Sequence, residues 1–177
     1  MKKKSKLIPL VIIIALFFST ATYFYFSENK ITNEEKFYDL NISSYLSTKG
    51  YIKINIDIGS NFILFKDQKN KCMAVVMPIS DVQANAIKQG IDEKIDTRPT
   101  TQDIIKDVFD YYNITILIIK IDEYRNDLYY AKMIIKQDNK ILNMDIRPSD
   151  ASAVASRYKK DIYFKKDIFD KKAQSIC

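Results

Sequence analysis

Apolar and polar residues alternate along the chain with two different periods. In residues 51–58, YIKINIDI, isoleucine takes every second position, and polar or tyrosine residues take the others. A period of two puts successive side chains on opposite faces, so this segment predicts a strand with one buried face. NFILFK and CMAVVM follow it across Gly59-Ser60 and a short polar loop. The pattern predicts an antiparallel meander of three short strands.

A second group of apolar segments lies further along the chain, written TILIIKI, LYYAKMIIK and ILNMDI. The residue pairs Asn126-Asp127 and Asp138-Asn139 separate these segments. Asn and Asp tolerate left-handed backbone conformations and therefore suit tight hairpin turns. These segments predict a second antiparallel group of strands.

Helical spacing of apolar residues marks three further segments. The first is SDVQANAIKQG, with Ser80 or Asp81 as its cap and Gly90 as its stop. The second is TTQDIIKDVFDYY, and the third begins near Ser149 and continues to Tyr158. The tail adds a short strand and a closing helical turn. The sum predicts an α+β fold of antiparallel strand groups and about three helices in a single domain.

The amino-terminal end carries a different pattern. Four lysines precede an uncharged, apolar stretch over residues 7–26, and twenty helical residues span roughly 30 Å, the thickness of a bilayer core. Positive charge stays in the cytoplasm, which predicts a single-pass anchor with the remaining chain outside the membrane. Ser19 and Ala21 offer the alternative of a signal peptide that is cleaved and releases a secreted domain.

These patterns divide the chain as follows: 1–6, a cytoplasmic basic end; 7–26, a transmembrane anchor; 27–50, a juxtamembrane linker; 51–172, the folded domain; and 173–177, a tail.

Charge and composition limit which partners, catalytic groups and metal ligands the sequence allows. Without the four amino-terminal lysines, 24 basic residues stand against 22 acidic ones, so the basic excess reflects topology more than nucleic-acid binding. The chain has no histidine, which excludes histidine-assisted nucleophiles and histidine-ligated zinc. Cys72 and Cys177 fit no metal-binding spacing, and the sequence leaves open whether they pair.

Two short motifs share the pattern Asp-x-Arg-Pro followed by Ser or Thr. They are DTRPTTQD, at residues 96–103, and DIRPSD, at residues 145–150, and each opens a predicted helix. A helix start favours an anion, and an adjacent arginine can grip phosphate with two hydrogen bonds. Asp145 and Asp150 could hold a divalent cation. The alternative is structural, because an Asp-Arg pair and a Ser-Asp cap also close a strand-to-helix junction.

Three segments carry a resemblance to a known family: RPTTQDIIKDVFDYYN, LYYAKMII and DIRPSDASAVASRYKKDIYF. In order and spacing they resemble the bifunctional nuclease domain of bacteria, archaea and plants, over roughly residues 51–172. The resemblance implies a compact α+β fold and nuclease activity on both DNA and RNA.

The resemblance is carried by individual positions. The matching positions are Arg98, Pro99, Thr101 and Asp103 in the first motif, Tyr130 and Ala131 in the strand, and Asp145, Arg147, Pro148, Ser149, Asp150 and Ala151 in the second motif. The chain departs from the family at three positions: Gln102 replaces the usual histidine, Gln83 the usual glutamate, and Ser80 the usual glycine.

These observations give one leading hypothesis and one alternative. The first is a membrane-anchored, extracytoplasmic nuclease-like protein that hydrolyses DNA or RNA with Mg²⁺ or Mn²⁺. Asp145 and Asp150 would bind the metal, while Arg98 and Arg147 would hold phosphate and act in catalysis. Further substrate contacts are expected from Ser149, Thr101 and Asp103. The alternative is a non-catalytic anion-binding or assembly module with the same fold, and the sequence leaves a homo-oligomer open.

Overall fold

The computed structural model describes residue 22 and residues 42–177. The chain divides into two compact units, Met1–Ser47 and Thr48–Cys177. In the described part of the first unit, residues 42–46 are helical and lie within the predicted linker. Apart from residue 22, the predicted basic end and anchor lie outside the described residues. Among the helices of the described residues, none has the length and apolar character needed to cross a membrane.

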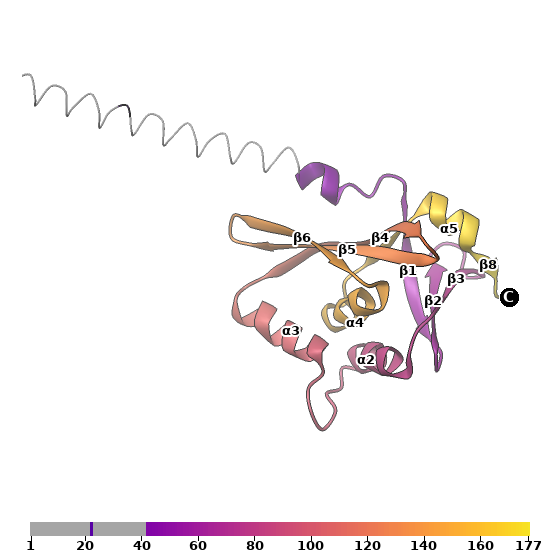
Figure 1. The fold of residues 1–177 in the computed structure, drawn as a ribbon, viewed down its shortest axis with the longest axis horizontal. Coiled ribbons are helices and arrows are strands. Elements are labelled where there is room, and N and C mark those ends of the chain that lie inside the picture. Colours follow the sequence, from indigo (N-terminus) through magenta and orange to yellow (C-terminus); the bar gives the residue numbers. More distant parts are fainter. Residues whose placement is uncertain (1–21, 23–41) are drawn as a thin grey trace, which may run out of the picture. The chain divides into compact units, whose positions relative to one another are not determined.

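The second unit is built on one sheet of eight strands (Figure 1). Their order across the sheet is β6-β5-β4-β7-β1-β2-β3-β8. The strands are β1 (Tyr51–Ile58), β2 (Phe62–Asp67), β3 (Met73–Pro78), β4 (Thr115–Arg125), β5 (Leu128–Gln137), β6 (Lys140–Ile146), β7 (Ile162–Lys165) and β8 (Gln174–Ser175).

The two predicted strand groups are joined into this single sheet by β7. Ile162 pairs with Ile54 of β1 in the antiparallel sense and with Ile119 of β4 in the parallel sense. Strand β7 therefore fills the gap between two meanders that are far apart in the sequence. At the other end of the sheet, β8 pairs with β3 beside a disulfide between Cys72 and Cys177.

Helices cover the apolar face of the sheet. They are α2 (Asp81–Ile91), α3 (Thr101–Tyr111), α4 (Pro148–Tyr158) and α5 (Lys166–Lys172). Strand residues such as Ile119 and Ile121 form one buried cluster with Val154 of α4, Phe109 of α3 and Phe169 of α5. The α+β fold predicted from the sequence is confirmed.

Helices α2 and α4 are close and parallel neighbours. Gln83, near the start of α2, contacts Ser149, near the start of α4. At the other end, a Cβ atom added to Gly90 would lie 2.9 Å from the Cβ of Ser156. Gly90 is therefore inside the helix as a packing residue, because α2 continues to Ile91. The prediction that Gly90 ends the helix is wrong.

The hairpin turns and the cap of α2 predicted from the sequence are confirmed, and the predicted cap of α4 is wrong. Asn126, Asp127 and Asp138 have positive φ angles, as predicted for the two hairpin turns. Ser80 caps α2 in a capping box with Gln83. Ser149 does not cap α4, because Arg147 takes the N-cap position and Pro148 the first helical position. Proline at this position costs no hydrogen bond and pre-sets the helical φ angle.

Candidate functional site

Strand β6 passes directly into helix α4 at the second Arg-Pro motif. Ser149 follows Pro148 in the first turn of α4 and is 4% exposed. Its hydroxyl oxygen accepts a hydrogen bond of 2.7 Å from Nε2 of Gln83. The side-chain oxygen of Gln83 accepts another hydrogen bond from the backbone N–H of Ser80. One amide therefore links the first turns of α2 and α4.

The parallel arrangement of α2 and α4 has an electrostatic consequence. Each helix carries a partial positive charge at its amino end, where backbone N–H groups lack helical partners. Since Gln83 and Ser149 bring the two amino ends together, both dipoles favour an anion on the same side of the molecule.

The first turn of α3 also contacts the first turn of α4. Nε2 of Gln102 donates a hydrogen bond of 3.3 Å to Oδ1 of Asp150. Nε of Arg147 donates one of 2.6 Å to Oδ2 of Asp150. This hydrogen bond, and then the charge of Asp150, raise the pKa of Arg147 further above its already high ordinary value. We call Gln83, Gln102, Arg147, Ser149 and Asp150 the helix-start site.

Arg147 is the group of this site that is available to a ligand. Its side chain is 72% exposed, while that of Asp150 is 23% exposed. An exposed guanidinium that shares one carboxylate keeps donors for a second acidic group. The helix-start site therefore suits a phosphate group that approaches from solvent.

Asp145 lies on the other face of the sheet. Its neighbours Met144 and Ile146 pack against the core, so strand alternation turns Asp145 away from the helices. It is exposed and stands opposite Lys132 of β5. Arg147 pairs with Asp150 and not with Asp145. The structure therefore does not bring Asp145 and Asp150 together.

The separation of Asp145 from Asp150 decides whether the two can bind the divalent cation that the sequence predicts. A magnesium site takes one or two carboxylates together with substrate oxygens. Both carboxylate oxygens of Asp150 already accept hydrogen bonds, and Asp145 faces the opposite side. Residues 42–177 contain no group of three or more metal-binding side chains. The Asp145–Asp150 pair does not fit a metal ion.

Asp103, of the first Arg-Pro motif, has a structural partner. Nε of Arg157 donates a hydrogen bond of 2.6 Å to its Oδ1, and the two side chains are 4% and 8% exposed, Arg157 first. The Thr100 backbone N–H donates to Oδ2 over 2.7 Å, which completes the capping box of α3. Burial alone would raise the pKa of Asp103, but the hydrogen bonds from Arg157 and Thr100 together lower it.

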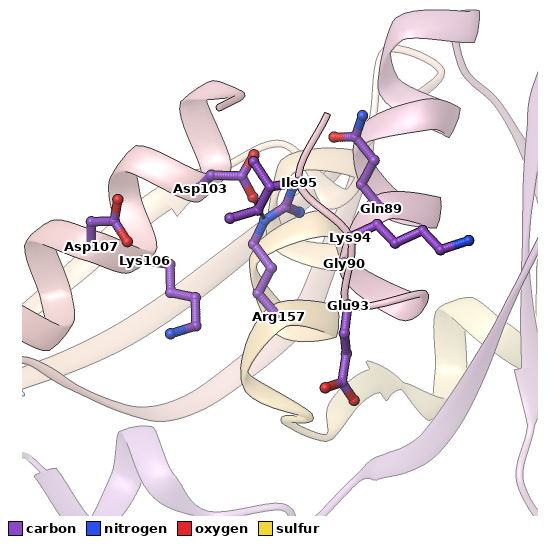
Figure 2. A pocket seen from close by; sticks show the side chains of 9 residues that line it. All are labelled: Gln89, Gly90, Glu93, Lys94, Ile95, Asp103, Lys106, Asp107 and Arg157. Carbon is purple, nitrogen blue, oxygen red and sulfur yellow. Dashed lines mark hydrogen bonds and ion pairs between the residues drawn. The ribbon is translucent and has the colours of Figure 1, made fainter. Parts of the chain in front are cut away.

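A pocket of about 160 Å³ lies next to this ion pair (Figure 2). Its lining residues come from the end of α2, the loop after it, α3 and the end of α4: Gln89, Gly90, Glu93, Lys94, Ile95, Asp103, Lys106, Asp107 and Arg157. The charged groups are of both signs, and Arg157 donates to the backbone oxygens of Ala86 and Ala153 as well as to Asp103. This pocket is at the opposite end of α2 and α4 from the helix-start site.

Arg98 and Thr101 are both exposed, Arg98 in the loop before α3 and Thr101 at its first position. Arg98 and Arg147 are both cationic donors, so they cannot bond to each other directly. What connects the two Arg-Pro motifs is the contact between Gln102 and Asp150.

Sequence reasoning assigned no role in the site to Gln83 or Arg157. In the sequence Gln83 stands out as a departure from the family, and a glutamine three residues after Ser80 is also the signature of a capping box. The sequence pattern that points to Arg157 is weaker. It follows Ala153 and Asp150 at helical spacing, which places it on the face of α4 that meets α3.

The family model of the bifunctional nuclease domain matches residues 63–176. The match covers more than half of the sequence, and the chain belongs to this family. A comparison with curated proteins finds no match.

Proposed function

We propose that the chain binds the phosphodiester backbone of DNA or RNA at the helix-start site. The observation that carries this proposal is the meeting of two parallel helix amino ends beside the exposed guanidinium of Arg147. Backbone N–H groups, helix dipoles and an arginine are the groups that proteins use to hold phosphate. Membership of the nuclease family supports nucleic acid as the source of that phosphate.

The site is better suited to binding than to cleavage. Positions 83 and 102, where the family usually has an acid and a histidine, hold amides that cannot accept or release a proton near neutral pH. The amide of Gln102 donates to Asp150, and Arg147 donates to it from the other side. Asp150 is therefore held as a structural acceptor. The function that the geometry supports best is a binding module that retains the nuclease fold.

Hydrolysis is the second candidate function, and the family match favours it. Asp150 is the one carboxylate of the helix-start site, so it would have to exchange its partners to act as a base or to hold Mg²⁺ or Mn²⁺.

We further propose that the domain lies outside the cytoplasm, on an amino-terminal anchor or released from it. The sequence pattern of residues 1–26 supports this location, and so does the disulfide between Cys72 and Cys177. Disulfides persist in oxidising compartments and are rare in the cytosol.

Nucleic-acid binding is tested with fluorescently labelled single-stranded DNA and RNA at several salt concentrations. We expect binding by the full chain, with an affinity that falls as salt rises. Arg147→Ala should weaken it and reduce the slope of log affinity against log salt by about one. Arg125→Ala is the matched control, since Arg125 is an exposed arginine on β4 that stacks on Tyr130. Equal effects of the two substitutions would refute the assignment of the site.

The same substrates with Mg²⁺ or Mn²⁺ separate the two candidate functions. We expect binding without product. Cleavage that Asp150→Asn abolishes would establish the second candidate instead.

A further inference from the structure

Strand β6 leaves one side of the sheet open. It is the first strand in the order of the sheet and pairs with β5 alone. Alternate residues of such an edge strand turn their N–H and C=O groups outward, where another strand can bind them. Native proteins often protect long edges with proline, bulges or covering segments. Within residues 42–177, β5 is the strand that pairs with β6, and the outer edge of β6 has no strand beside it.

Helix α3 presents an apolar surface next to this edge. Its side chains Asp103, Lys106 and Asp110 face α4, where they contact Arg157 and Tyr158. The opposite flank of the helix is apolar and exposed: Ile104 is 52% exposed, Val108 42%, Tyr111 80% and Tyr112 54%.

The position of α3 along β6 follows from its two ends. Near its start, Gln102 contacts Asp150, just beyond the end of β6. At its other end, the backbone oxygen of Tyr112 accepts from Gln137, which pairs with the first residue of β6, Lys140. Helix α3 therefore runs antiparallel to β6, as Figure 1 shows on the side of the molecule where both elements lie. Leu142 of β6, 56% exposed, adds to the apolar flank.

We propose that this edge patch, formed by β6 and by Ile104, Val108, Tyr111 and Tyr112, is the interface of a homodimer. A two-fold axis at Asn143, the middle residue of β6, would pair the two β6 strands in the antiparallel sense and extend the sheet across both copies. An interface of this kind must complement itself. The unpaired backbone N–H and C=O groups of β6 would pair with the same groups of the partner copy. The apolar flank of α3 would pack against the same flank of the partner copy.

The side chains of β6 fit this register. Leu142 stands opposite Met144 of the partner copy, which gives one apolar pair on each side of the axis. Lys140 stands opposite Ile146, and Ile141 opposite Asp145. No position places like charges opposite each other, an arrangement that would destabilise the pair.

The charges beyond the strand ends favour a second copy over an unrelated peptide. In the same register, Arg147 lies opposite Asn139 of the partner copy and next to its Asp138. Both Arg147 and Asp138 are exposed. Asp138, in the turn between β5 and β6 of each copy, would then lie at the edge of the other copy's helix-start site.

The mass of the full chain in mild detergent, measured by sedimentation or light scattering across a dilution series, tests the proposal. We expect a dimer that Val108→Glu weakens by roughly tenfold or more, because it places two charges near the axis in an apolar contact. Val82→Glu is the matched control, since Val82 is a 79% exposed valine on α2, outside the edge patch. Circular dichroism confirms that both variants are folded. A monomer at every concentration overturns the proposal, and so does equal weakening by the two variants.

Cross-linking tests the register itself. Residues directly opposite in antiparallel strands have Cα atoms about 4.5–5.5 Å apart, which is within the range that a disulfide spans. We expect Asn143→Cys to give a covalent dimer under oxidation, because the two native cysteines are already paired. Gln68→Cys, at an exposed position outside the edge patch, should remain monomeric. A dimer that Asn143→Cys does not link would rule out this interface.

Discussion

At the scale of single residues, the buried ion pair of Asp103 and Arg157 is the interaction on which three helices depend. Asp103 belongs to α3 and Arg157 to α4, while a second nitrogen of Arg157 donates to the backbone oxygen of Ala86 in α2. Charges that are both buried and hydrogen-bonded in this way are expensive to separate, because the remaining charge cannot reach water. This pair gives the acidic residue Asp103 of the first motif a structural role.

Asp103→Asn should lower the free energy of unfolding by roughly 3–5 kcal/mol at neutral pH, because Arg157 stays buried without its counter-ion. The measurement is urea unfolding followed by circular dichroism. Asp107→Asn, an exposed position one turn further along α3, should change the stability by no more than about 0.5 kcal/mol. A small effect of Asp103→Asn, close to that of the control, would contradict the structural role.

The Asp103–Arg157 pair also predicts that the stability of the fold depends on pH. The pKa of Asp103 is lowered in the folded protein, so its ionised form stabilises the fold at any pH above the unfolded pKa of about 3.9. This contribution is lost as the pH falls through the lower, folded value. The difference in stability between the native chain and Asp103→Asn should therefore shrink below about pH 4. A difference that stays constant into acid would show that Asp103 does not titrate with a lowered pKa.

At the scale of elements, local patterns and long-range contacts differ in how well the sequence predicts them. Alternation and short apolar segments predicted β1 to β6, and Asn-Asp and Asp-Asn pairs predicted the hairpin turns, because these signals are properties of neighbouring residues. The placement of β7 between β1 and β4 depends on pairings across more than forty residues, which no local pattern encodes. For the same reason, sequence reasoning found the Arg-Pro motifs but not the contacts of Gln83 and Arg157 that organise them.

The close approach of α2 and α4 is a testable property of these elements. Gly90→Ala should reduce the thermal stability, although alanine is the better helix former, because the new Cβ would lie 2.9 Å from the Cβ of Ser156 and 3.1 Å from the Ala153 oxygen. Overpacking of this kind costs about 1–3 kcal/mol. Adding Ser156→Gly should recover part of the loss. Asn85→Ala, at an exposed position of α2, is the control that should not destabilise.

At the scale of the whole molecule, one disulfide encloses most of the second unit, from β3 to its end. Cys72 and Cys177 are separated by 105 residues, and the ring they close contains both Arg-Pro motifs. Cross-linking a loop of this length restricts the unfolded chain strongly.

Reduction of this disulfide should lower the stability by roughly 2–5 kcal/mol. Denaturant midpoints measured with and without reductant provide the test, and Cys72→Ser with Cys177→Ser should reproduce the effect of the reductant. If the variant without cysteines were as stable as the native chain, the ring would not constrain the unfolded state.

The proposed location makes a separate prediction for intact cells. Because lysines precede the apolar stretch, protease added outside should digest the domain without lysis. Digestion that begins only after the cells are lysed would place the domain inside.

The covalent ring also determines how the molecule responds to mechanical load. A force applied before Cys72 and at Cys177 passes from one sulfur to the other and bypasses the strands and helices between them. The bypassed chain could extend by roughly 350 Å if it were free, at about 3.3–3.6 Å per residue. With the disulfide intact, only β1, β2 and the residues before Cys72 can be pulled out of the sheet. If the chain is held at a membrane, as proposed, the ring from Cys72 to Cys177 stays closed under load, and reduction would remove that limit.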